Sequence, residues 1–145
     1  DTLASLLGLD VISPFGPDGE KCGRLCTTSE TTAHGLCNKI KETLGAPCVL
    51  CGNPEKEIRT VALLGGDGKS FISEALKVGA DAFVTGASGY NAALEAADRE
   101  LAVIDAGHYH TEFLPLVQRM TSLISSAFAD VSVAVSGAGC EISCF

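Results

Sequence analysis

The segment from Asp105 to Glu112 contains the residue types best suited to bind a metal ion. It has the sequence Asp-Ala-Gly-His-Tyr-His-Thr-Glu and follows an apolar run. His108 and Glu112 are four residues apart, so a helix that begins here brings both side chains to one face. An imidazole nitrogen and a carboxylate oxygen at this spacing can bind one divalent cation together. His108 and Glu112 are therefore candidate metal ligands, and Asp105, at the expected strand end, is placed to orient His108.

The spacing of this pair also has a simpler explanation. A carboxylate near the start of a helix is stabilised by the positive end of the helix dipole, whether or not a metal is present. The spacing alone favours this second explanation over metal binding. Two further histidines are weaker candidates: His110 is expected to point away from the face of His108 and to lie at the surface or behind the ligands, and His34 is expected to be partly exposed in the middle of a helix.

A second polar segment, Gly-Gly-Asp-Gly-Lys-Ser at residues 65–70, suggests phosphate binding. Lys69 and Ser70 open an expected helix, whose free N–H groups favour an anion. The Walker pattern requires a glycine five positions before Gly68, where this chain has Leu63, so that motif fails. A tight glycine turn that lets a helix pack closely is the favoured explanation. Asn91, in the loop 85–91, is a further residue that could face a substrate.

The elements that must position these residues follow from the apolar periodicity of the chain. Strands alternating with helices indicate an α/β fold, with a mainly parallel sheet and helices on both faces in three layers. Loops after parallel strands emerge at one sheet edge, so the three polar loops could converge there. The expected helices are 1–8, 29–44, 70–78, 89–99 and 110–128; the expected strands are 23–27, 48–51, 60–64, 82–85, 101–105 and 131–135; residues 10–22 are expected to form a loop.

Composition restricts the classes of protein that this chain can represent. Its 145 residues, 46% of them hydrophobic, suit one domain over residues 1–145 with a real core. No apolar run approaches the roughly 18 residues that a membrane span needs. The net charge of −8 and scattered Lys and Arg residues argue against nucleic-acid binding. The chain does not begin with Met, which suggests that its beginning lies elsewhere.

The seven cysteines are expected to be buried or incidental thiols in a cytoplasmic protein. Cys48 and Cys51 fall on an expected strand, where residues i and i+3 point to opposite faces, unlike a redox Cys-x-x-Cys at a helix start. The remaining pairs lack the closely spaced, doubled arrangement of a zinc site; they are Cys22 with Cys26 and Cys140 with Cys144.

Three segments together resemble the NIF-three-like family, whose members are also known as GTP cyclohydrolase I type 2 homologues. They are residues 61–70, 79–86 and 104–112, and the third is the most specific, because the family motif is Asp-Ala-Gly-His-Tyr-x-Thr-Glu. The resemblance implies a three-layer α/β fold, toroidal homohexamers and two divalent metal ions of the zinc, iron or manganese class. His108 and Glu112 match two ligands of that site, and Glu112 would bridge the metals.

This chain departs from the family pattern in two places. Family members supply an adjacent His pair and an Asp from an upstream half, which this sequence does not contain, and their Tyr-His is Tyr90-Asn91 here. The resemblance thus covers a C-terminal half. It implies a metal-dependent hydrolase or cyclohydrolase acting on a small molecule, with an incomplete metal site in this chain. A non-enzymatic oligomeric scaffold or regulator of the same fold is the alternative, and a phosphate- or nucleotide-binding module through Lys69 and Ser70 is a weaker one.

Overall fold

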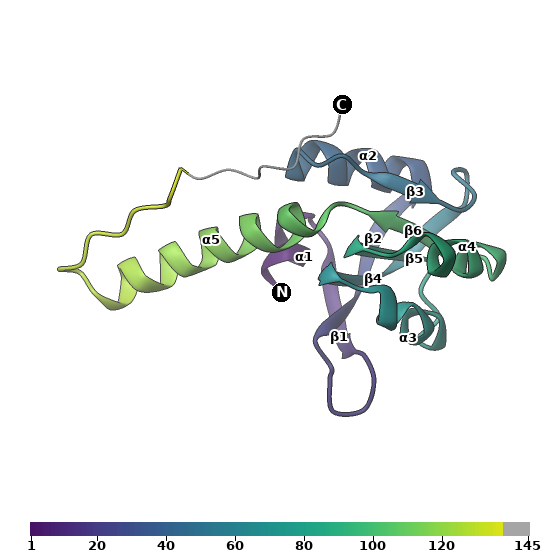
Figure 1. The fold of residues 1–145 in the computed structure, drawn as a ribbon, viewed down its shortest axis with the longest axis horizontal. Coiled ribbons are helices and arrows are strands. Elements are labelled where there is room, and N and C mark those ends of the chain that lie inside the picture. Colours follow the sequence, from purple (N-terminus) through teal and green to yellow (C-terminus); the bar gives the residue numbers. More distant parts are fainter. Residues whose placement is uncertain (138–145) are drawn as a thin grey trace.

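The computed structural model, which describes residues 1–137, is built around one six-stranded sheet with the strand order β1-β2-β4-β5-β6-β3 (Figure 1). Strands β4, β5 and β6 run parallel, whereas β1–β2, β2–β4 and β3–β6 pair antiparallel. The expected mainly parallel sheet is therefore mixed, and its parallel part is confined to three strands. The strands are β1 (Asp10–Phe15), β2 (Gly23–Thr32), β3 (Val49–Cys51), β4 (Glu57–Asp67), β5 (Ala82–Ala87) and β6 (Ala102–Asp105).

Helices cover both faces of the sheet, as expected. The helices are α1 (Thr2–Leu6), α2 (Ala33–Leu44), η1 (Lys69–Phe71), α3 (Ile72–Lys77), α4 (Tyr90–Asp98) and α5 (His108–Ala127). Side chains alternate along each buried strand, so Val84 joins the core beneath α1 and α2 while Phe83 joins the core beneath α3 and α4. The sheet therefore has one apolar core on each of its faces.

The first edge of the sheet differs from the expectation. Residues 10–15, expected to form part of a loop, form β1, which pairs with β2. Pro14 lacks an N–H group, but an edge strand tolerates this because one of its sides has no strand neighbour. β2 also continues to Thr32, so α2 begins at Ala33 and not at residue 29. Thr32 is the N-cap of α2, and its hydroxyl accepts a hydrogen bond of 3.1 Å from the Gly35 N–H.

The last part of the described chain differs from the expectation in two ways: its helix is longer, and the expected strand does not form. α5 begins at His108, two residues before the expected start, and projects from the body of the molecule (Figure 1). Residues 131–135 do not form the expected strand: they run back alongside α5, where residues 133–136 and Val117 line the same hollow. The alternating valines of this segment suit a strand, but the two edges of the sheet are β1 and β3, and among residues 1–137 no strand pairs with this segment.

Candidate metal-binding site

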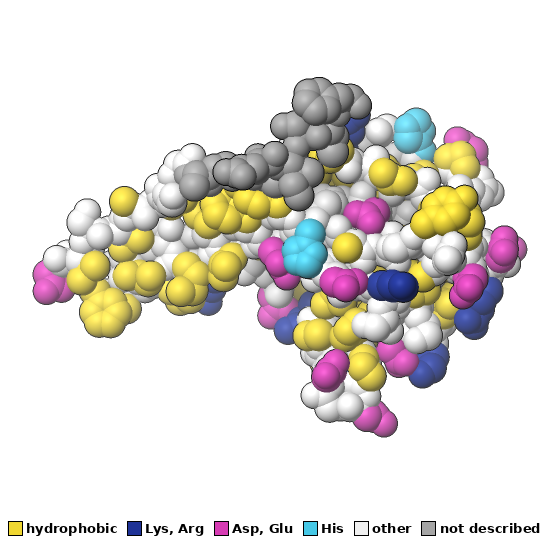
Figure 2. Space-filling model, viewed as in Figure 1, with side chains coloured by type: hydrophobic (Ala, Val, Ile, Leu, Met, Phe, Trp, Pro, Cys, Tyr) yellow, Lys and Arg dark blue, Asp and Glu magenta, His cyan; other side chains and the backbone are white. Residues whose placement is uncertain are grey.

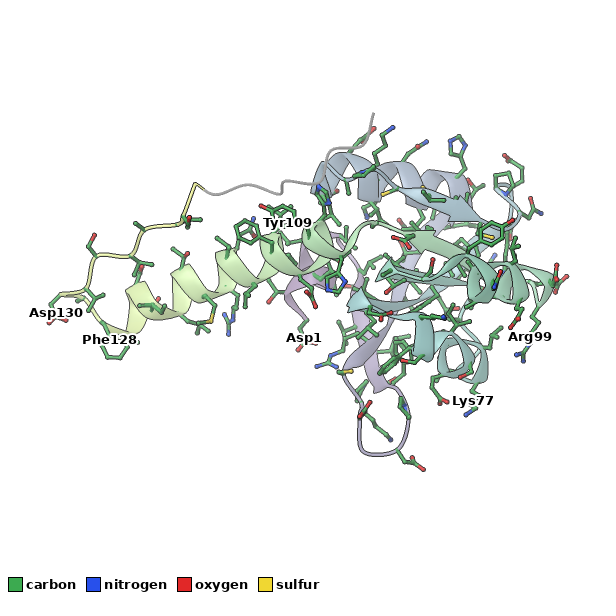
Figure 3. The ribbon with its side chains drawn as sticks, in the orientation of Figure 1. Asp1, Lys77, Arg99, Tyr109, Phe128 and Asp130 are labelled. Carbon is green, nitrogen blue, oxygen red and sulfur yellow. The ribbon has the colours of Figure 1, made fainter. Side chains whose placement is uncertain are left out.

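His108 and Glu112 lie together on the first turns of α5. The Nε2 atom of His108 is 2.9 Å from Oε2 of Glu112, and the two side chains are 55% and 54% exposed. α5 starts directly after β6, so the pair lies at the carboxyl ends of the parallel strands, where open α/β sheets place their ligands. Figure 3 shows this end of α5, near the labelled Tyr109, packed against the sheet. Both donor atoms therefore remain accessible on a supported helix.

Glycines at the end of β4 let α5 approach the sheet this closely. A Cβ atom on Gly65 would be 2.8 Å from the backbone oxygen of Thr111. A Cβ atom on Gly66 would be 2.8 Å from Cδ of Glu112 and 3.3 Å from Nε2 of His108. Gly66 also has a φ of +73°, a backbone angle that residues with a side chain rarely adopt. The favoured explanation of a glycine turn for close packing is thus correct for Gly65 and Gly66, although the helix that approaches them is α5 and not the helix that follows.

A buried hydroxyl network fastens α5 to the sheet beneath the pair. Thr111, only 3% exposed, accepts a hydrogen bond of 3.0 Å from the N–H of Gly66. Its hydroxyl also lies 3.1 Å from the backbone oxygen of Gly107 and 3.2 Å from that of His108. Thr85, fully buried on β5, donates to the oxygen of Gly66 at 3.1 Å. No role was assigned to Thr111 or Thr85 from the sequence. The position of Thr111 in the first turn of a helix, where a hydroxyl can bond to nearby backbone groups, was the one signal for it.

Asp105 makes its hydrogen bonds to Ser88 and Gly107, and none of those described for residues 1–137 joins it to His108. Its Oδ2 accepts hydrogen bonds from the N–H of Ser88 at 2.8 Å and from the Ser88 hydroxyl at 3.0 Å. Its Oδ1 accepts from the N–H of Gly107 at 3.2 Å. Asp105 thus fixes the turn between β6 and α5 and ties it to the end of β5. Gly107, whose N–H donates to Asp105, immediately precedes His108 in the chain.

Lys69, Ser70 and Asn91 are exposed neighbours of this sheet edge, not members of the pair. Among residues 1–137, no described hydrogen bond or ion pair joins any of them to His108 or Glu112. The N–H of Lys69 donates to the carboxylate of Asp67 at 3.1 Å, so an acidic side chain occupies the start of η1 that a phosphate would need. This geometry weakens the phosphate-binding interpretation of residues 65–70.

The other histidines and the cysteines are placed as follows. His34 is exposed on α2, and the ring of His110 packs edge-on against Tyr109 with centroids 5.4 Å apart. Cys48 and Cys51 pack against opposite cores, as the strand geometry predicted. Cys26 and Cys37 are buried, and Cys22 is exposed. Cys140 and Cys144 lie outside the described residues.

The chemistry and spacing of the donor pair are compatible with a divalent ion. Metal–ligand bonds of about 2.1 Å at right angles place adjacent donor atoms roughly 3.0 Å apart, close to the 2.9 Å between Nε2 and Oε2. In the described part of the chain, however, no group of three or more His, Cys, Asp or Glu side chains could hold a metal ion. The pair fits a metal as two donors of a larger set. A complete site requires further ligands.

The chain is an α/β domain with a mixed sheet, and the helix that follows its last parallel strand carries His108 and Glu112. The chain belongs to the Duf34/NIF3 (NGG1p interacting factor 3) family, whose model matches residues 1–139. It is 29% identical over 140 residues to a Clostridium acetobutylicum protein named GTP cyclohydrolase 1 type 2 homolog, covering 92% of this chain and 52% of that protein. A Streptomyces coelicolor protein of the same name is 36% identical over 124 residues, covering 78% of this chain and 44% of that protein. The chain spans about half the length of these curated relatives.

Solved structures have the same fold. A Bacillus cereus protein related to NIF3 superposes with a TM-score of 0.74 at 25% identity, covering 85% of this chain and 35% of that chain. A Staphylococcus aureus protein superposes with a TM-score of 0.79 at 18% identity, covering 99% of this chain and 63% of that chain, and supports the fold alone. Within residues 1–137, no helix is both long and apolar enough to cross a membrane.

Proposed function

We propose that this chain supplies two ligands, His108 and Glu112, to a divalent metal site used for hydrolytic or cyclohydrolase-type chemistry. The observation that carries the proposal is the 2.9 Å separation of Nε2 and Oε2 on a half-exposed face of α5. The names of the curated relatives support the reaction class, and the family resemblance supports a pair of metal ions. The substrate would be a small molecule, with GTP as the first candidate from those names.

The residues of this chain would contribute to such a site by holding and orienting its ligands. His108 would supply an imidazole nitrogen and Glu112 a carboxylate oxygen, while Thr111 holds the helix turn that carries both. When bound, the metal ion would act as a Lewis acid and would lower the pKa of a bound water. The remaining ligands must come from groups outside the described residues, because two protein donors are fewer than such sites usually have.

A hollow beside Glu112 leaves room for such additional groups. It has a volume of about 470 Å³ and is bordered by the first residues of the chain and by the near part of α5. Its lining consists of Asp1, Thr2, Leu3, Glu112, Pro115, Leu116 and Arg119. The hollow is open, so a substrate or a second polypeptide could reach Glu112 from this side.

The test is metal content measured on purified protein loaded with Zn²⁺, Mn²⁺ or Fe²⁺ and then desalted. We expect metal to be retained by the wild type and lost from His108→Ala and Glu112→Ala, with affinity at least about tenfold lower. His34→Ala is the matched control, because His34 is an exposed histidine on α2. A wild-type chain that retains no metal would contradict the proposal, as would equal retention by Glu112→Ala. Formate release from GTP, measured on the same samples, tests the reaction class.

The alternative function is a non-enzymatic oligomeric scaffold, and one surface favours it. Large apolar side chains are exposed along the projecting part of α5, visible as the yellow groups on the arm in Figure 2. These are Leu116, Met120, Leu123 and Phe128. Contiguous exposed apolar groups mark interaction surfaces. Light scattering measures the oligomeric state, and the family resemblance implies a hexamer. An oligomer that contains no metal and has no activity would favour the scaffold.

A further inference from the structure

Two cysteines from separate elements meet on the core side of the sheet. Cys37 lies on α2, and Cys48 lies directly before β3; both belong to or pack against the same apolar cluster. The two thiol groups lie close enough for each to influence the ionisation of the other. Cys37 is only 8% exposed, whereas Cys48 is half-buried. One member of the pair can therefore be reached from solvent while the other lies behind it.

We propose that Cys37 and Cys48 form a reversible disulfide that joins α2 to the edge strand β3. A disulfide needs two sulfur atoms that can approach to bonding distance from elements that do not have to move far. The mutual influence of the two thiols indicates the closeness that the first condition requires, and the packing of Cys48 against the cluster that contains Cys37 of α2 meets the second. The other candidate pair of this region, Cys48 with Cys51, fails because these side chains pack against opposite cores.

The reaction is a thiol–disulfide exchange with a low-molecular-weight disulfide such as oxidised glutathione. The Cys48 thiolate attacks one sulfur of glutathione disulfide, forms a mixed disulfide and releases one glutathione thiolate. The Cys37 thiolate then attacks the Cys48 sulfur, forms the Cys37–Cys48 bond and releases the second glutathione thiolate. The protein loses two protons and two electrons, and the oxidant is reduced to two glutathione molecules.

The surroundings of the pair determine how readily it reacts. Burial raises the pKa of both thiols, that of Cys48 to about 12. Because the thiolate is the reactive form, exchange is slow at neutral pH, and the reduced pair persists in a weakly oxidising setting. Raising the pH from 7 to 9 increases the thiolate fraction about 100-fold, so the oxidation is carried out at the higher pH.

The proposed disulfide would lie close in the structure to the residues that precede His108. Val49, the residue after Cys48, is paired with Asp105 in the β3–β6 ladder. Asp105 in turn accepts the N–H of Gly107, immediately before His108. A covalent bond at Cys48 would fasten the strand that flanks Asp105. The thiol pair and the candidate metal ligands are different groups, so the test of the proposed disulfide does not depend on whether the protein binds metal.

The experiment is peptide mapping of the full chain after incubation with oxidised glutathione at about pH 9. Trypsin places Cys37 in residues 25–39 and Cys48 in residues 42–56, with Cys26 and Cys51 as second cysteines in the same peptides. We expect a cross-linked pair of these peptides, two hydrogen atoms lighter than their sum, with fragment ions assigning the bond to Cys37 and Cys48. Reduction with dithiothreitol should restore the separate peptides.

Two variants and one control complete the test. Cys37→Ala should leave Cys48 as a stable glutathione mixed disulfide, and Cys48→Ala should prevent the cross-link. Cys22→Ser, at an exposed thiol, should leave the cross-link unchanged. Absence of the cross-link in the wild type, while Cys22 becomes glutathionylated, would overturn the proposal, and so would a cross-link that survives in Cys48→Ala. The wild-type map decides the question even if a variant of the buried Cys37 fails to fold.

Discussion

The N–H of Gly66 donates a hydrogen bond of 3.0 Å to the hydroxyl of Thr111, at a buried position and across 45 residues of sequence. This bond joins the end of β4 to the first turn of α5, and it lies beneath both candidate ligands. The placement of His108 and Glu112 therefore depends on a residue that binds no metal itself. Stability measurements can test this dependence separately from metal binding.

Replacing Thr111 with Val should lower the free energy of unfolding by about 1–3 kcal/mol, because the buried N–H of Gly66 loses its acceptor. Denaturant unfolding measures this change. Thr43→Val is the control: the Thr43 hydroxyl donates to the Lys39 oxygen at 2.8 Å at an exposed position, where water can replace it. Equal effects of the two substitutions would contradict a special role for the buried bond.

Gly66→Ala should weaken metal binding more than it weakens the fold. The added Cβ would press on the Glu112 carboxylate, a flexible group that can move away from its position beside His108. We expect about tenfold lower metal affinity, measured by titration. Gly79→Ala is the matched control, since Gly79 has a φ of +70° and nothing within 4 Å of the new Cβ. Both variants carry the same backbone strain, so similar metal affinities would show that the contact with Glu112 is unimportant.

Asp105 and Ser88 should be energetically coupled. Two hydrogen bonds join them, from the Ser88 N–H and hydroxyl to Oδ2. A double-mutant cycle of Asp105→Asn and Ser88→Ala should give a coupling of about 1 kcal/mol in the free energy of unfolding. Strictly additive effects would show that the hydrogen bond from the Ser88 hydroxyl contributes nothing measurable to this coupling.

Asp81 should make the fold sensitive to acid. Burial alone would raise the pKa of its carboxyl, but hydrogen bonds from the N–H groups of Thr60 and Arg59 and from the Thr60 hydroxyl lower it below the ordinary value of 3.8. A lowered folded-state pKa means that the stabilisation is present above the unfolded-state pKa, near 4, and is lost as the pH falls through the folded-state value.

Asp81→Asn should therefore lower the free energy of unfolding at pH 7 by about 2 kcal/mol, and by less at about pH 2. Urea unfolding at the two pH values measures the difference. Asp98→Asn, at the exposed end of α4, is the control. An equal loss at both pH values would show that ionisation of Asp81 does not contribute to stability.

Local sequence determined the element types that position the site. Short apolar runs predicted the central strands, and the apolar spacing after residue 108 predicted α5, because these patterns depend on residues a few positions apart. The four-residue spacing of His108 and Glu112 is likewise a local property of a helix. The family motif identified the same two residues. Each of these features is therefore specified by residues that lie close together in the sequence.

Tertiary structure alone decided the remaining features, because they depend on contacts between distant segments. The strand at residues 10–15 exists through its pairing with β2, whereas the valines at 131–135 pair with no strand in the described part of the chain. Asp105 binds Ser88 and not His108, because the end of β5 lies beside it. The approach of Gly66 to Thr111 and of Cys37 to Cys48 follows from packing across the sheet, which no spacing in the sequence specifies.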